Sequence, residues 1–284
     1  MSITAASGQL DSAAAQASQP GGAAGFGRLM AAEWTKLRSV RSTVWTLLLF
    51  VIITIGLTAL LSWLTVSNWT GPRAAPRDAR VAADPIGFIF GAGIGLGQLT
   101  ICVLGVLLIT TEYSTGVIRA SLLAVPKRYP MLAAKIAVFG LLMLVLSELV
   151  AFGSFFVGSA ILHSRVVVSL SGPGVLRATL GAGFYLTVLG ILALAVGAIV
   201  RHTAAGISIV IGIVLVLPIL AGLLPSNWGA HINAYLPQQA GSLVYAVHQS
   251  SGQLLTAWEG FGVFCIWAVL LLAVATYLLN RRDA

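Results

Sequence analysis

Six long apolar stretches are the feature that most limits what this chain can fold into. Each stretch has 19 to 29 residues, and a helix of roughly 20 residues is long enough to cross the hydrocarbon core of a bilayer. Inside lipid only a helix or a closed barrel satisfies every backbone polar group, and the two-residue alternation of a barrel is absent. The sequence therefore predicts an all-α, polytopic membrane protein with six transmembrane helices. The predicted spans are 44–64, 86–109, 133–161, 176–200, 206–224 and 258–279.

The composition agrees with a membrane protein and argues against several other classes. Of the 284 residues, 58% are hydrophobic and 8% are charged, whereas about 25% of the residues of a soluble domain are charged. The net charge of +8 comes from short basic groups between the spans, a pattern that indicates membrane topology and no nucleic-acid partner. The cysteines and histidines have no metal-binding spacing, so we expect no metal site.

The distribution of Lys and Arg predicts the orientation of the chain. Six spans place both termini on one side, where 11 of the 16 basic residues then lie, against 5 on the other side. Cytoplasmic segments are enriched in Lys and Arg, so we expect both termini in the cytoplasm, although the Arg-bearing loop 71–80 opposes the trend. Residues 1–25, rich in Ala, Ser, Gln and Gly, are predicted to be a disordered tail. The transmembrane domain then covers 26–284.

The segment 26–43 is predicted to be an amphipathic helix at the membrane interface. Its apolar face consists of Phe26, Met30, Trp34 and Leu37. The basic residues that leave this face are Arg28, Lys36, Arg38 and Arg41. An aromatic ring among apolar residues, with basic residues on the other side, suits the headgroup region of a bilayer. Anchoring alone does not require Glu33, so we expect this carboxylate to have a protein partner.

The charged segment between the second and third spans is the next element outside the bilayer. Residues 112–125 can form a short helix that Pro126 ends, because proline has no backbone N–H to continue it. On a helical wheel the polar face consists of Glu112, Thr115 and Arg119. A polar stripe with an apolar back suits a helix that lies on the membrane and offers one face to a cytoplasmic partner.

Two further patterns concern the packing of the bundle. Residues 225–257 contain no Lys, Arg, Asp or Glu, and we expect one or two short re-entrant helices broken at Pro237 and Gly241, with a small extracellular cap as the alternative. Closely spaced glycines predict tight helix packing inside the bundle or at a seam between two copies. These glycines are Gly87, Gly91, Gly93, Gly95 and Gly97 in the second span, and Gly181 and Gly183 in the fourth.

Three motifs together indicate a family. The first, before the first span, is Glu33-Trp34-x-Lys36-Leu37-x-Ser39-x-Arg41-Ser42. The second is Glu112-Tyr113-x-x-Gly116-x-Ile118-Arg119-x-x-Leu122, followed by Pro126-x-Arg128. The third, which is weak alone, is Leu236-Pro237-x-x-Ala240-Gly241. In this order, over about residues 24–282, they resemble the membrane subunits of the type-two permease family of ATP-binding-cassette (ABC) exporters.

The resemblance implies a six-helix permease in the bacterial plasma membrane, working as a homodimer with two copies of a separate ATPase subunit. It implies that 112–128 is a coupling helix, which contacts the ATPase, and that 26–43 is a connecting helix that helps transmit its motion. The expected coupling residues are Glu112, Tyr113, Thr115, Gly116, Arg119, Lys127 and Arg128. The expected residues of the interfacial helix are Glu33, Trp34, Lys36, Arg38 and Arg41.

The energy source of such a permease would lie outside this chain. The sequence contains no GxxxxGK[ST] motif, so we expect no enzymatic activity and no bound cofactor here, with ATP and Mg bound by the partner ATPase. Membrane lipids are the remaining expected partner. The apolar bundle favours export of an amphipathic or hydrophobic compound, such as a drug, natural product, peptide or lipid.

Glu148 lies midway in the third predicted span, where an exposed carboxylate would cost about 2.5 to 3.5 kcal/mol or more. We expect either an interhelical hydrogen bond or a position on the translocation path. The alternative to an ABC permease is a secondary transporter or channel that needs no ATPase, although no inverted repeat supports it. An intramembrane enzyme is disfavoured, because HExxH, GxSxG and clustered carboxylates are all absent.

Overall fold

The computed structural model describes residues 25–73, 75–116, 128–224, 226–248 and 252–281, and every regular element in these residues is a helix. The first half contains α2 (Phe26–Ser39), α3 (Arg41–Ser67), α4 (Pro76–Ala83), α5 (Pro85–Ser114) and α7 (Arg128–Leu162). The second half contains α8 (Val175–Val200), α9 (Thr203–Ile211), η1 (Gly212–Val216), α10 (Leu217–Gly222), α11 (Ser226–Ala234), α12 (Pro237–Ser242), η2 (Leu243–Tyr245) and α13 (Ala257–Arg281). The predicted tail lies almost entirely outside the described residues.

The six predicted spans are confirmed as helices. Within the described residues, six helices are long and apolar enough to cross a membrane. They are Arg41–Ser67, Pro85–Ser114, Tyr129–Leu162, Val175–Val200, Thr203–Gly222 and Ala257–Leu279. The largest difference from prediction is at the end of the second span, which continues past residue 109 to Ser114. The chain is therefore an all-helical, multi-pass membrane protein.

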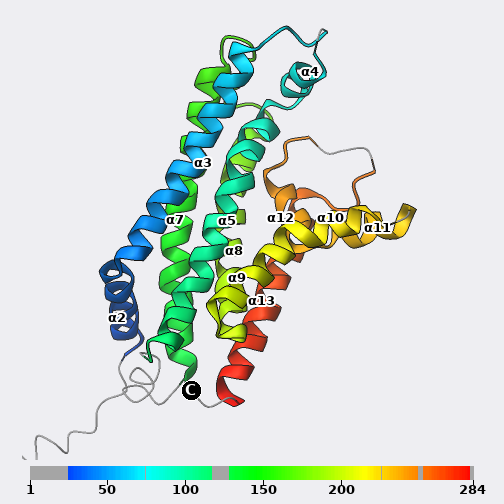
Figure 1. Ribbon diagram of the computed structural model, residues 1–284. Helices are drawn as coiled ribbons and strands as arrows, with labels where there is room; N and C mark the ends of the chain where they lie inside the picture. Colours follow the sequence, from blue (N-terminus) through cyan, green and yellow to red (C-terminus); the bar gives the residue numbers. More distant parts are fainter. Residues whose placement is uncertain (1–24, 74, 117–127, 225, 249–251, 282–284) are drawn as a thin grey trace, which may run out of the picture.

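Helix α8 is the centre of the bundle, and it packs against α5, α7, α9 and α13. Figure 1 shows the long helices α3, α5, α7 and α8 side by side, with α2 beside one end of the bundle and α4 at the other. Buried residues occur along nearly the whole of α8, whereas α3 exposes large apolar side chains such as Trp45, Ile52 and Trp63. The core therefore surrounds α8, and α3 faces outward along one side.

Small residues explain how closely α3 and α5 approach. A Cβ atom at Gly93 would lie 2.5 Å from the carbonyl oxygen of Thr54, and one at Gly97 would overlap the side chain of Thr54. Close approach of two backbones requires residues without bulky side chains. Gly91 and Gly95 instead face open space within the described structure, so the predicted packing role is confirmed for only part of the glycine run.

The fifth span is interrupted by the π-helix η1, between α9 and α10. Pro218 is the second residue of α10, two positions after the end of η1. Proline has no N–H and would clash with the carbonyl four residues earlier in a regular helix. One wider turn removes that conflict: the N–H of Leu217 bonds the carbonyl of Gly212, five residues back. The proline thus explains the interruption.

The uncharged segment before the last span contains the short helices α11, α12 and η2, where one or two were expected, and their re-entrant position stays a prediction. Figure 1 shows α11 running across the direction of α13 and away from the bundle. Pro237 begins α12, but Gly241 lies within α12, where Phe264 packs against it, so a break at Gly241 is wrong. Arg177 of α8 donates hydrogen bonds to the carbonyls of Val244 (3.0 Å) and Ala246 (2.8 Å).

A buried carboxylate organises the loop that joins α3 to α4. Oδ2 of Asp78 accepts hydrogen bonds from the backbone N–H groups of Thr70 (2.9 Å) and Gly71 (3.1 Å), and Arg77 donates to Oδ1. Burial alone would raise the pKa of Asp78, but these donors and the Arg77 charge bring it below its ordinary value of 3.8. Ionised Asp78 therefore stabilises the loop at a pH above the pKa that this carboxyl has in the unfolded chain. This contribution is lost as the pH falls through the lower pKa that Asp78 has in the folded protein.

Replacing Asp78 by Asn should loosen this loop, because one acceptor oxygen becomes an amide nitrogen that cannot accept a bond. We expect hydrogen exchange at the amides of Thr70 and Gly71 to become roughly tenfold faster. In the unmodified protein their protection should persist at neutral pH and fall below pH 3.8. Asp84→Asn, which keeps an acceptor oxygen for the N–H of Gly87 at the start of α5, is the matched control, and equal acceleration in that variant would contradict the assignment.

Candidate functional site

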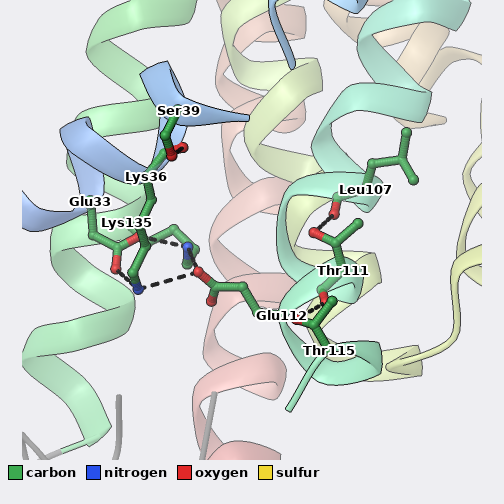
Figure 2. Close-up of polar contacts among 8 residues, drawn as sticks. All are labelled: Glu33, Lys36, Ser39, Leu107, Thr111, Glu112, Thr115 and Lys135. Carbon is green, nitrogen blue, oxygen red and sulfur yellow. Dashed lines mark hydrogen bonds and ion pairs between the residues drawn. The ribbon is translucent and has the colours of Figure 1, made fainter. Parts of the chain in front are cut away.

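Four charged side chains from three helices meet at one end of the bundle. They are Glu33 and Lys36 of α2, Glu112 in the last turn of α5, and Lys135 near the start of α7. Figure 2 shows the two carboxylates and the two ammonium groups pointing toward one another. We call this group the ion-pair cluster.

Lys135 is the centre of the ion-pair cluster. Its Nζ atom lies 2.6 Å from Oε2 of Glu33 and 2.8 Å from Oε1 of Glu112. Lys36 contacts the same two acids, at 2.6 Å from Oε1 of Glu33 and 3.3 Å from Oε1 of Glu112. The formal charges of two acids and two lysines cancel, so the cluster connects α2 to α5 and α7 without a net charge.

The members of the ion-pair cluster differ in exposure. The side chain of Lys135 is 3% exposed and that of Glu33 is 6% exposed, while Lys36 is 34% exposed. Removing one member of a buried ion pair leaves the other charge uncompensated, at a cost of about 3 to 5 kcal/mol, whereas exposed pairs contribute about 1 kcal/mol or less. Lys135 is therefore the member whose loss should matter most.

The two members of the ion-pair cluster that lie on α2, Glu33 and Lys36, remain charged in this setting. Burial alone would raise the pKa of Glu33, but the charge of Lys135 and hydrogen bonds from both lysines lower it below 4.5. Burial alone would lower the pKa of Lys36, but Glu33 and Glu112 raise it above 10.5. The contribution of Glu33 to stability is lost as the pH falls through the lowered pKa of its carboxyl group in the folded protein. The contribution of Lys36 is lost as the pH rises through the raised pKa of its ammonium group in the folded protein. The pairs with α2 are thus complete at neutral pH.

Glu112 is oriented differently from the sequence-based expectation. We expected it on an outward polar face with Thr115, but its side chain is 11% exposed and points toward Lys135. The reason is local: residues up to Ser114 continue α5 rather than begin a separate helix. Thr115 is exposed and donates to the carbonyl of Thr111 at 2.7 Å.

The other predicted coupling residues are only partly described. Tyr113 lies under the guanidinium of Arg201, 4.9 Å from the ring centre, and Gly116 has a φ of 70°, which favours glycine. Arg119 and Lys127 lie outside the described residues, and Arg128 begins α7. Most of the predicted coupling helix therefore lies outside the described residues.

A helix forms where the interfacial helix 26–43 was predicted, but it ends at Ser39, and its location at the membrane interface stays a prediction. Residues 26–39 form α2, with Trp34 and Arg38 exposed and Leu37 buried. Arg41 is exposed at the start of α3. The partner predicted for Glu33 exists, but within this chain it consists of Lys36 and Lys135. The protein's own bundle therefore satisfies Glu33.

Sequence reasoning missed Lys135, because a lysine near the end of a predicted span usually extends its ammonium group toward the interface. The structure instead buries it between two carboxylates. A signal was present: apart from Asp11 and Asp283 near the termini, Glu33 and Glu112 are the two acids of the predicted cytoplasmic segments. Two acids in so basic a region require basic partners, and a lysine inside a span end is a suitable one.

Glu148 lies in the middle of α7 and packs against Gly183 of α8. The interhelical hydrogen bond that we expected is not observed, because neither carboxylate oxygen has a hydrogen-bond partner among the described residues. A side chain at Gly183 would overlap this carboxylate. Glycine at 183 therefore provides the space that Glu148 occupies. Whether this acid lies on a translocation path stays a prediction.

Other kinds of site have little support in the described part of the chain. No group of three or more His, Cys, Asp or Glu side chains there could hold a metal ion. Comparisons with protein-family models and with curated protein sequences find no match to this chain. The sequence motifs and the geometry of the ion-pair cluster are therefore the observations that bear on the function of this chain.

Proposed function

We propose that this chain is the membrane-spanning permease subunit of an ABC exporter, driven by a separate ATPase. One observation carries the proposal. Glu33 belongs to the motif before the first span and Glu112 to the motif after the second, and both bind Lys135. Two motifs that are far apart in the sequence thus meet at one site. This is the arrangement that a permease needs if its interfacial helix and coupling segment are to move together.

The mechanism follows from the connections of the ion-pair cluster. Helices α5 and α7 flank the segment 117–127, which is most of the predicted coupling helix 112–128. The resemblance implies that this helix contacts the ATPase. In the proposed cycle, closure of the ATPase subunits on ATP displaces this segment, and with it the ends of α5 and α7. Because Lys135 and Lys36 join both helices to α2, α2 moves with them. Transport then results from switching between inward-facing and outward-facing packings.

The remaining parts of the proposal concern partners and location. Two permease copies and two ATPase subunits would form the transporter, with ATP and Mg on the ATPase and both permease termini in the cytoplasm of a bacterial cell. The apolar outward surfaces of α3 and α13 are available for lipid and for a second copy. An amphipathic or hydrophobic compound is the proposed substrate class.

A specific contact tests the ATPase assignment. We expect Thr115→Cys, at an exposed position next to the segment 117–127, to form a disulfide cross-link with a cysteine placed in a candidate ATPase subunit, one that carries a GxxxxGK[ST] motif. The matched control is Ser171→Cys, which is also exposed and lies in the loop between α7 and α8. Cross-linking of both cysteines, or of neither across a series of ATPase positions, would contradict this location of the contact.

One observation favours a second candidate function, an ion-coupled secondary transporter. Glu148 presents a carboxylate without a hydrogen-bond partner among the described residues, in the middle of a span, and such acids often mark ion pathways. The two candidates differ in their energy source. Collapse of the proton gradient at constant ATP should stop a proton-coupled transporter and should leave an ABC exporter active.

A further inference from the structure

An apolar groove lies between α2 and α7, beside the ion-pair cluster. It has a volume of about 260 Å³ and is lined by Met30, Ala31, Trp34, Val138 and Leu141. Trp34 is 49% exposed and Leu141 is 58% exposed, so the groove is open on its outer side. Leu141 continues into a row of exposed residues on α7 that includes Val145 and Leu149. The groove therefore joins a surface that faces the bilayer in a membrane-spanning chain.

Exposed positive charge lies next to this groove. We grouped Arg38 with the basic residues that leave the apolar face, but it follows Trp34 by one turn of α2 and so lies within roughly 40° of it around the helix axis. Arg41 begins α3, and both arginines are exposed. The one acid of α2, Glu33, is already ion-paired with Lys36 and Lys135. The charges within the cluster cancel, so the two exposed arginines leave a net positive charge where α2 ends and α3 begins, one turn beyond Trp34 of the groove.

We propose that this groove binds an anionic glycerophospholipid, with an acyl chain between α2 and α7 and the phosphate beside Arg38 and Arg41. The apolar lining suits a hydrocarbon chain, and exposed guanidinium groups suit an anionic headgroup at the membrane surface. A zwitterionic lipid would bring its own positive charge near the arginines. The open apolar groove and the net positive charge beside it therefore favour a lipid with an anionic headgroup over a zwitterionic one.

The lipid site has a structural consequence for the ion-pair cluster. Met30 and Trp34 of α2, and Val138 and Leu141 of α7, line the groove on the same two helices that Glu33 and Lys135 connect. A bound lipid would contact both helices at once and stabilise their association, because any ligand that binds the folded state preferentially stabilises it. This inference requires membrane insertion of the chain but no ATPase, so it goes beyond the proposed function.

The test is fluorescence quenching of the purified full chain in lipid nanodiscs. Nanodiscs contain phosphatidylcholine and phosphatidylglycerol, with bromine on the acyl chains of one lipid or of the other. The contribution of Trp34 is the difference between the unmodified chain and Trp34→Phe. We expect brominated phosphatidylglycerol to quench Trp34 more strongly than brominated phosphatidylcholine. The Arg38→Gln and Arg41→Gln substitutions should each reduce this preference by about fivefold.

Two control variants distinguish a site from general attraction to a charged leaflet. Arg28→Gln removes an exposed charge from another face of α2, and Arg73→Gln removes one from the loop that joins α3 to α4. Both should retain most of the preference. Equal quenching by the two lipids, or equal losses in the Arg28→Gln and Arg38→Gln variants, would overturn the proposal. A third result would also overturn it: a disulfide between two copies of the Trp34→Cys variant, together with no quenching of Trp34 in the unmodified chain. A second copy of the chain would then cover the groove.

Discussion

Replacing Lys135 by Met should lower the free energy of unfolding by about 3 kcal/mol, at the low end of the range for breaking a buried ion pair. Methionine keeps most of the volume of the lysine but removes its charge. Glu33 and Glu112 then share Lys36 alone, whose side chain is 34% exposed. The measurement is the midpoint of thermal unfolding of the purified chain in detergent, with urea unfolding for the free energy.

Lys36→Met is the matched control for this prediction, because it is the same substitution in the same ion-pair cluster. The exposure of Lys36 should limit its effect to about 1 kcal/mol. Combining Lys135→Met with Glu112→Gln removes one of the uncompensated acids. The double variant should therefore lose less free energy of unfolding than the sum of the losses in the two single variants. Equal effects of the two lysine substitutions would show that Lys135 is not the centre of the cluster.

Replacing Gly105 by Leu should destabilise the bundle by about 3 kcal/mol or prevent its folding, because it forces α5 away from α8. A Cβ atom at Gly105 would lie 2.6 Å from the carbonyl oxygen of Gly190 and 2.8 Å from Cβ of Ala193. Neither atom belongs to a flexible side chain that could move aside. We expect a large loss of monodisperse protein after detergent extraction, measured by size-exclusion chromatography.

Gly262→Leu is the control for the Gly105 substitution. Gly262 lies in α13, and no heavy atom of the described structure lies within 4 Å of a Cβ atom placed there. Leucine favours a helix more than glycine does, by about 0.8 kcal/mol, so this variant should be as stable as the unmodified chain or slightly more so. Comparable losses in both variants would mean that α5 and α8 are not packed as described.

The spans could be predicted from the sequence because the requirement for long apolar helices is strong. All six were located within five residues at each end, since the hydrocarbon thickness determines the length and charged or polar residues mark the limits. The interruption of the fifth span was not predicted. Pro218 was visible, but whether a proline in a span produces a kink or a π-helix depends on the packing around it.

The site was predictable in part. The motifs identified Glu33 and Glu112 as important, but they suggested that these acids serve partners outside the chain. Their shared contact with Lys135 depends on how α2 crosses α7 and where α5 ends, and helix periodicity alone does not determine such tertiary geometry. Tertiary geometry also explains why the prediction for Glu148 failed. Its polarity suggested an interhelical hydrogen bond, but its carboxylate lies in close contact with Gly183.

We propose that a separate ATPase drives this chain through helix α2 and the segment 117–127. The test is co-purification of the tagged chain with a candidate ATPase that carries a GxxxxGK[ST] motif, followed by measurement of ATP hydrolysis in proteoliposomes. We expect a stable complex whose ATP turnover differs from that of the ATPase alone, and we expect the Glu112→Gln variant to lose this difference. A chain that purifies without the ATPase, or a complex whose turnover matches that of the free ATPase, would contradict it.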